Sequence, residues 1–251
     1  MLTLLFFTIF YQISYGCDCI KNAQVDIEDV FETKYILRGK VLNTYIDTIK
    51  LEYETNAESY ERKYEMLIAE LEIQLFYKGG IEHSKVKLIT PIPSSGLCGI
   101  DFKKGKEYIV WSNELIGEKY VVSLCSRTTN NEVTKKEQIQ ILDFYLKNKN
   151  KDIWKDENNL IRVKGNYKNK LPTGEWKFYN EKGCIKSKGY FNKGVKIDRW
   201  QKYDCDCREI STTTNCPLLN KIKPNLKCAA IVKEQLFYQE GELVKIIELD
   251  E

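Results

Sequence analysis

The chain has 251 residues, of which 43% are hydrophobic and 30% are charged, as in an ordinary soluble globular protein. This length suits one large domain or two modest ones. The formal net charge of +3 is too small to indicate a protein that binds nucleic acid or an anionic membrane surface.

Residues 1–16 are apolar and uncharged, and we expect them to be a secretory signal peptide. Ser14 and Gly16 supply the small side chains that suit cleavage before Cys17, and the stretch is too short for a transmembrane helix. A buried N-terminal strand or helix is one alternative. A lipoprotein signal that leaves Cys17 lipid-anchored is another, although Ser14 stands where such signals favour Leu. The prediction is a protein that is secreted or lies in the cell envelope.

Nine cysteines follow the predicted cleavage site. They form an N-terminal group of four and a C-terminal group of five, namely Cys17, Cys19, Cys98 and Cys125, then Cys184, Cys205, Cys207, Cys216 and Cys228. In an exported protein this number indicates a disulfide framework with one thiol left over. A zinc site is the alternative for the C-terminal group. Because His83 is the only histidine, such a site would need to be all-cysteine.

Residues 17–130 are predicted to be mostly β, with a short helix over 24–34. In the segment 69–77 apolar and polar residues alternate, and this period of two indicates a half-buried strand. Residues 44–63 are polar without a clean period, so we expect a long hairpin excursion there. Five strands at this spacing suit a small closed or partly open barrel, and they cover residues 35–41, 69–77, 86–90, 107–111 and 120–124.

A helix is predicted over residues 131–148, followed by a polar linker at 147–152. Its apolar residues at helical spacing are Ile139, Leu142, Tyr145 and Leu146. The predicted organisation has a signal peptide, a barrel domain, a connecting helix with its linker, and a C-terminal module with a Cys-rich insertion. These segments cover residues 1–16, 17–130, 131–150, 151–251 and, for the insertion, 204–234.

An internal repeat with an offset of 24 residues runs through residues 165–203. This offset aligns Gly165 with Gly189 and Trp176 with Trp200 in the sequence. This pattern indicates hairpins whose aromatic side chains stack on the next hairpin, with Gly and Asn at the turns. It resembles the MORN-type repeats of bacterial exported proteins. The resemblance implies an antiparallel β-hairpin repeat module, whose protein partner is unknown.

A series of short motifs between residues 17 and 126 resembles the netrin-like domain. The motifs are Cys17-X-Cys19, Phe31, Leu-Arg-Gly-Lys-Val at 37–41, Tyr-Lys-Gly at 77–79, Cys98-Gly99, Phe-Lys-Lys-Gly-Lys-Glu-Tyr at 102–108, and Cys125. A Cys-X-Cys at the first mature residue is similar to the tissue inhibitors of metalloproteinases (TIMPs). The resemblance implies an OB-type five-stranded barrel with flanking helices. It does not extend into the C-terminal half of the chain.

The Cys-X-Cys motif limits the disulfide pairing. Cysteines one residue apart rarely bond each other, so Cys17 and Cys19 are each expected to pair with Cys98 or Cys125. Two connectivities stay open, and we predict Cys17–Cys98 with Cys19–Cys125. The loops that these bonds enclose are long, so each bond contributes about 4–5 kcal/mol by restricting the unfolded chain.

The TIMP resemblance implies that the α-amino group and carbonyl oxygen of Cys17 bind the catalytic zinc of a target protease. Zinc of this kind keeps an open position, and an α-amino group with a pKa of about 7.7–8.0 loses its proton easily. The ridge that would occlude the protease comprises Cys17, Asp18, Cys19, Ser95, Leu97 and Cys98. The favoured function is therefore a metalloendopeptidase inhibitor that is not an enzyme and uses no cofactor of its own.

Asp18 departs from the family pattern, which has a small hydroxyl residue after the first cysteine. A carboxylate that enters an apolar pocket without a partner is costly. Either the target differs from animal matrix metalloproteinases, or the domain binds something else. The alternative function is a non-inhibitory extracellular or cell-surface module for adhesion or scaffolding.

The other residues considered as possible site residues are expected to have structural roles. His83 lacks a second histidine and is predicted to be a solvated loop residue. Glu70 and Glu72 are two residues apart on one strand, which fits a solvated barrel exterior better than an acid–base pair. Trp176 and Trp200 are predicted to pack inside the repeats, and a sugar-binding face is their alternative role. We find no catalytic triad or phosphate-binding signature in the sequence.

Overall fold

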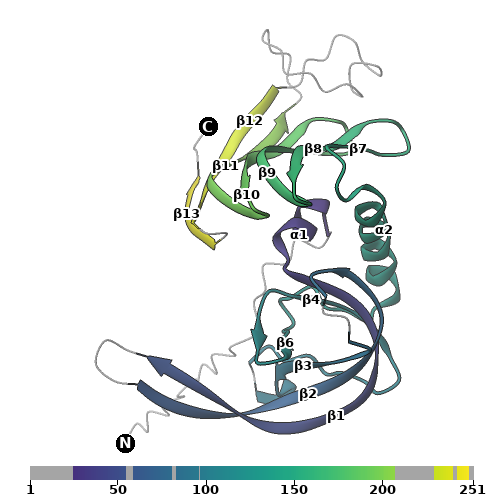
Figure 1. The fold of residues 1–251 in the computed structure, drawn as a ribbon, viewed down its shortest axis with the longest axis vertical. Coiled ribbons are helices and arrows are strands. Elements are labelled where there is room, and N and C mark those ends of the chain that lie inside the picture. Colours follow the sequence, from purple (N-terminus) through teal and green to yellow (C-terminus); the bar gives the residue numbers. More distant parts are fainter. Residues whose placement is uncertain are drawn as a thin grey trace, which may run out of the picture. The chain divides into compact units, whose positions relative to one another are not determined.

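The computed structural model describes residues 25–54, 59–80, 83–95, 97–206, 229–239 and 242–248. The protein is mainly β, with a curled half-barrel sheet and a second, antiparallel sheet (Figure 1). Two compact units divide the chain, Met1–Leu142 and Asp143–Glu251. The boundary falls inside the second helix, a few residues before the linker that the composition predicts.

The half-barrel sheet has the strand order β4-β1-β2-β3-β6-β5. Its strands are β1 (Tyr35–Glu54), β2 (Ser59–Lys78), β3 (Lys85–Pro91), β4 (Glu107–Ser112), β5 (Leu115–Ile116) and β6 (Lys119–Val121). The pair β3–β6 is parallel, and the other neighbours are antiparallel. All five predicted strands are present, although β6 is shorter than expected. The two-residue strand β5 was not predicted.

The alternating segment of β2 builds the core of this unit. Ala69 and Leu71 are fully buried in a cluster that draws on every strand from β1 to β4 and on β6. The alternation fails further along, because Leu75 is 39% exposed while Phe76 packs on the core. Two irregularities in the pairing of β1 with β2 lie beside these residues. Each bulge shifts the pattern by one residue and reverses the face that the next side chains occupy.

Part of the β1–β2 hairpin extends beyond the rest of the sheet. The pairing of β2 with β3 ends at Met66 and Pro91, whereas β1 and β2 stay paired up to Glu54 and Ser59. Figure 1 shows these paired strand ends projecting past β3. The predicted hairpin excursion is therefore a regular two-stranded arm, which starts where β3 runs into the loop that carries Cys98.

The described part of the chain contains two α-helices. The first, α1 (Ile27–Glu32), begins at Asp26, which forms a capping box with Asp29. The second, α2 (Glu132–Asn148), begins where the Asn131 side chain accepts hydrogen bonds from two backbone N–H groups. Both helices were predicted from the sequence. Among the described residues, no helix is long and apolar enough to span a membrane.

The second sheet is antiparallel throughout, and its strands follow one another in chain order. They are β7 (Ile153–Lys155), β8 (Ile161–Lys168), β9 (Leu171–Tyr179), β10 (Ile185–Asn192), β11 (Val195–Asp206), β12 (Ala229–Gln239) and β13 (Glu242–Glu248). Both ends of the predicted Cys-rich insertion belong to strands β11 and β12. Its middle, residues 207–228, lies outside the described part of the chain.

Two glycine–tryptophan pairs in this sheet have the same geometry. Trp176 and Trp200 are both fully buried. A Cβ atom on Gly165 would lie 2.1 Å from the Trp176 ring, and one on Gly189 would lie 2.2 Å from the Trp200 ring. Only glycine allows the indole to lie this close to the neighbouring strand. The burial confirms that both tryptophans pack in the core, and it excludes an exposed sugar-binding role for them.

The aromatic contacts around Trp176 recur around Trp200, at the equivalent position of the repeat. Tyr167 meets Trp176 edge-on at 5.0 Å between ring centroids, and Phe191 meets Trp200 edge-on at 5.1 Å. Phe191 also touches Trp176 at 5.6 Å, and Phe178 touches Trp200 at 6.0 Å. These contacts form a continuous row of rings through the sheet. Edge-on pairs of this kind add about 0.5–1.5 kcal/mol each beyond their buried area.

Candidate functional site

The predicted ridge residues fall into two groups. Cys17, Asp18 and Cys19 lie outside the described residues. Ser95 ends the short 3-10 helix Pro93–Ser95, and Leu97 and Cys98 follow it in the connection between β3 and β4. The second group therefore occupies one surface loop, which starts at the end of β3 beside the root of the two-stranded arm.

The backbone of this loop is held tightly against the end of β3. A Cβ atom on Gly99 would lie 1.9 Å from the Pro91 carbonyl oxygen, so the loop crosses the strand where only glycine fits. The Ile100 N–H donates to the Thr90 hydroxyl at 3.1 Å, and Cys98 has a positive φ of 59°. The side chain of Leu97, directly before this turn, is 63% exposed.

A second loop lies directly beside the first. The Leu124 N–H donates a hydrogen bond of 2.8 Å to the Cys98 carbonyl oxygen. Cys125 follows Leu124 in a turn that the Ser126 hydroxyl closes by donating to the Ser123 carbonyl oxygen at 2.8 Å. The two cysteines that were predicted to hold the N-terminus thus sit on adjacent loops.

Three cysteines whose side chains the structure describes are oxidised. Cys98, Cys125 and Cys184 are each disulfide-bonded, and no two of these three are bonded to each other. Their partners lie among the cysteines whose side chains the structure does not describe. The pairings Cys17–Cys98 and Cys19–Cys125 stay predictions, as does the pairing of the C-terminal group.

Peptide mapping of the unreduced, exported protein is expected to recover Cys17–Cys98 and Cys19–Cys125 as two cross-linked peptides. The adjacency of the two loops favours one bond from each of Cys17 and Cys19, in either order, because a single Cys-X-Cys segment can reach both loops. Recovery of Cys98 and Cys125 as free thiols would contradict the disulfide framework. The crossed pairing would keep the framework but reverse the order of the two bonds.

Helix α1, which follows the Cys-X-Cys segment in the sequence, is fastened to the same region. The Arg127 guanidinium, on the loop after Cys125, donates to the Asp29 carboxylate at 2.8 Å. Burial raises the pKa of the Asp29 carboxyl, although the N–H of Asp26 and the charge of Arg127 favour its ionised form. Arg127 itself has a positive φ of 57°, an uncommon backbone conformation for a residue other than glycine.

Lys78 caps the other end of α1. Its Nζ donates to the carbonyl oxygens of Val30 at 2.7 Å and Phe31 at 2.8 Å, which belong to the last turn of the helix. Burial lowers the pKa of Lys78 to about 7, and the charge of nearby Glu32 opposes this effect. The amine can still donate both hydrogen bonds when it is neutral. Lys78 belongs to the Tyr-Lys-Gly motif at 77–79, but nothing in the sequence indicates that it contacts α1.

The free energy of unfolding is expected to rise with pH between the folded pKa of Lys78, about 7, and its unfolded value near 10.5. In this window the unfolded chain binds a proton that the folded chain lacks, so raising the pH favours folding. Lys78→Met removes this titration. Urea unfolding of both proteins at several pH values should therefore give a stability difference that changes with pH. A difference that stays constant would contradict the assignment.

A small cavity lies between α1 and the loop after β6. Its volume is about 190 Å³, and its walls include Asp29, Trp111, Cys125 and Arg127. The indole N–H of Trp111 already donates to Gln138 at 2.9 Å, and Asp29 already pairs with Arg127. These contacts commit the side chains of Trp111, Asp29 and Arg127 to holding the fold around the cavity.

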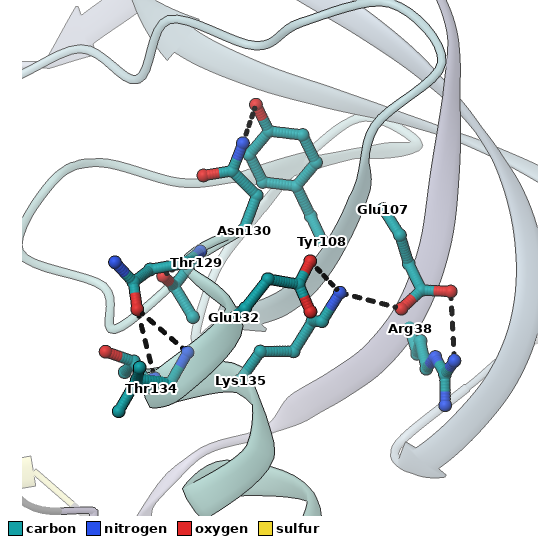
Figure 2. Close-up of polar contacts among 10 residues, drawn as sticks. Arg38, Glu107, Tyr108, Thr129, Asn130, Glu132, Thr134 and Lys135 are labelled. Atoms are coloured by element: carbon teal, nitrogen blue, oxygen red, sulfur yellow. Dashed lines mark hydrogen bonds and ion pairs between the residues drawn. The ribbon is translucent and has the colours of Figure 1, made fainter.

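A chain of charged groups fastens α2 to the half-barrel (Figure 2). Glu107 on β4 accepts from Arg38 on β1 at 3.0 Å and pairs with Lys135 on α2 at 3.3 Å, and Lys135 also reaches Glu132 at 2.9 Å. Burial works to raise the pKa of Glu107, but the hydrogen bonds from Arg38 and Lys135 outweigh it and hold the pKa below its usual value. This network has a structural role, because both of its carboxylates are paired.

The weaker candidates have the surroundings that the sequence predicts. Glu72 is exposed, and Glu70 lies 3.9 Å from Lys87 on the neighbouring strand. His83 is exposed. Within the described ranges, no group of three His, Cys, Asp or Glu residues is placed to hold a metal ion. In comparisons with known proteins, no protein-family model and no curated protein matches the chain.

Proposed function

We propose that this chain is a secreted inhibitor of a zinc metalloendopeptidase. In this proposal, Cys17, Asp18 and Cys19 lie across the loops that carry Cys98 and Cys125, and this ridge occludes the active site of the protease. The hydrogen bond from Leu124 to the Cys98 carbonyl oxygen carries the proposal, because it brings both disulfide-bonded loops to one place.

The fold supports an OB-type, netrin-like assignment for residues 17–130. The sheet is curled, and its strand order includes the parallel pair β3–β6. The Ser112 hydroxyl donates to the Val121 carbonyl oxygen at 2.8 Å, and the Val121 N–H donates to Glu114 at 3.0 Å. These bonds link the end of β4 to β6, as expected for a small, partly open barrel. We also propose that residues 151–251 form a MORN-like repeat module.

The proposed chemistry uses the backbone of Cys17, and the zinc belongs to the protease. A neutral α-amino group and a carbonyl oxygen can fill the open position of a catalytic zinc. Two disulfides on adjacent loops would hold these atoms in place, and preorganisation of this kind reduces the entropy lost on binding. Leu97, 63% exposed beside Cys98, would supply apolar contact area to the partner.

A non-inhibitory binding module is the second candidate, and Asp18 is the observation that favours it. An unpaired carboxylate disfavours entry into an apolar protease pocket. Leu97 and Leu124, which are 63% and 42% exposed, offer apolar contact to any protein partner. The same loops would then bind a partner without blocking a catalytic zinc.

Leu97→Asp is expected to weaken inhibition at least about 30-fold, because it places a charge at a desolvated contact worth about 2 kcal/mol. Inhibition constants against the most sensitive zinc endopeptidase of a panel would measure this loss. Val133→Asp is the matched control, since Val133 is 70% exposed on α2, away from the ridge residues in sequence. Equal inhibition by the native and Leu97→Asp proteins would contradict the role of this loop.

A further inference from the structure

Three lysines stand side by side on the second sheet. Strand pairing places Lys164 on β8 directly opposite Lys177 on β9, and Lys177 directly opposite Lys188 on β10. We call these three residues the lysine row. The residues that flank each lysine along its strand point to the core and are buried, namely Val163, Gly165, Trp176, Phe178, Ser187 and Gly189. The lysine row therefore lies on the outer face of the sheet.

The register of the strands brings three positive charges close together. Neighbouring strands lie about 4.8 Å apart, so the three ammonium groups project from adjacent positions. Like charges directly opposite each other destabilise a sheet. A negatively charged partner on this face would therefore meet three neighbouring positive charges.

Only one lysine of the row is neutralised by an ion pair among the described side chains. Lys177 lies 2.9 Å from Glu175, whereas none of these ion pairs involves Lys164 or Lys188. Lys188 instead lies over the ring of Tyr203, 5.5 Å from its centroid. The row thus keeps a local excess of positive charge.

Tyrosine rings lie among these charges. Tyr190 is two residues from Lys188 on β10, on the same face, and is 48% exposed. Tyr203 is half-buried beside Lys188, and its hydroxyl donates to Gln201 at 3.1 Å. A tyrosine ring offers an apolar face together with a polar edge. The lysine row with Tyr190 and Tyr203 forms what we call the basic face.

We propose that the basic face binds an anionic polysaccharide whose sugars carry sulfate or carboxylate groups. Such a polymer is extended, and it can lay successive anionic groups along the lysine row while the apolar faces of its sugar rings cover Tyr190 and Tyr203. An acidic peptide would satisfy the lysines but would leave the tyrosine rings without a matching surface. This binding function is independent of protease inhibition and would retain the protein at a glycan-rich surface.

The test is calorimetric titration of the full chain with a short heparin oligosaccharide. Replacing the row in Lys164→Gln/Lys177→Gln/Lys188→Gln is expected to weaken binding at least about tenfold. The matched control removes the same charge from exposed lysines at or next to the β8–β9 and β10–β11 turns, in Lys168→Gln/Lys170→Gln/Lys193→Gln. The control should stay within about twofold of the native protein, because its charges lie off the row. Equal losses in both variants, or no binding by the native protein, would overturn the proposal.

Three further measurements distinguish a polysaccharide from other anionic partners. Desulfated heparin should bind more weakly than heparin, and Tyr190→Leu should weaken heparin binding but not polyglutamate binding. Polyglutamate or phosphatidylserine vesicles that bind as tightly as heparin, with the same dependence on the row, would overturn the polysaccharide assignment in favour of an acidic protein or a membrane. The double variant Lys164→Gln/Lys188→Gln leaves the Lys177–Glu175 pair intact. It repeats the test if the triple variant unfolds.

Discussion

Replacing Trp176 or Trp200 with alanine is expected to lower the free energy of unfolding by about 3–5 kcal/mol. Both indoles are fully buried, and each packs edge-on against an aromatic ring of a neighbouring strand. Each indole N–H also donates to a backbone carbonyl oxygen, that of Thr173 for Trp176 and that of Tyr190 for Trp200. Truncation would leave a cavity and an unpaired carbonyl oxygen on the same sheet.

Chemical denaturation followed by circular dichroism would measure the loss. Tyr190→Ala is the matched control, because it removes an aromatic ring that is 48% exposed and should change stability by less than about 1 kcal/mol. If both tryptophan variants unfold at the same denaturant concentration as the native protein, the aromatic row does not stabilise the second sheet, and the interpretation of the 24-residue repeat as a packing unit is wrong.

Adding one alanine before Cys17 is expected to abolish protease inhibition without changing the melting temperature. The extension turns the α-amino group of Cys17 into an amide, whose nitrogen has no available lone pair for zinc. Acetylation of the mature N-terminus should have the same effect. Neither change touches the disulfides, the core or the described loops at Cys98 and Cys125.

Inhibition constants and thermal unfolding of the native, extended and acetylated proteins would be compared on the same protease. N-terminal sequencing of the secreted protein is the companion measurement, since the mechanism requires Cys17 to be the first residue with a free amine. An extended form that inhibits as strongly as the native protein would show that the α-amino group is not the zinc ligand.

Local patterns in the sequence predict much of the fold. The period of two around Ala69 and Leu71 predicts a core strand, and the in-phase glycines and tryptophans predict the paired contacts of the second sheet. The short strands β5 and β7 carry too few residues for any pattern. The reversal at Leu75 depends on bulges, which are set by pairing with β1 rather than by β2 alone.

Fewer features of the candidate site than of the fold could be predicted from the sequence. Cys98 and Leu97 could be found because a motif marks them. The contacts of Lys78 with α1 and the Asp29–Arg127 pair could not, since these residues are distant in sequence and come together only in the folded chain. The lysine row could not be predicted either, because Lys164 and Lys177 become neighbours only through the register of β8 and β9.

Titration of a panel of zinc endopeptidases with the secreted native protein tests most directly whether this chain is a protease inhibitor. The Asp18→Thr form belongs in the same experiment, because it removes the carboxylate that disfavours an apolar pocket. We expect the native protein to inhibit at least one protease, and the Asp18→Thr form to inhibit those with apolar pockets more strongly. If neither form inhibits any protease, the inhibitor function is contradicted, and the loops around Cys98 and Cys125 belong to a binding module.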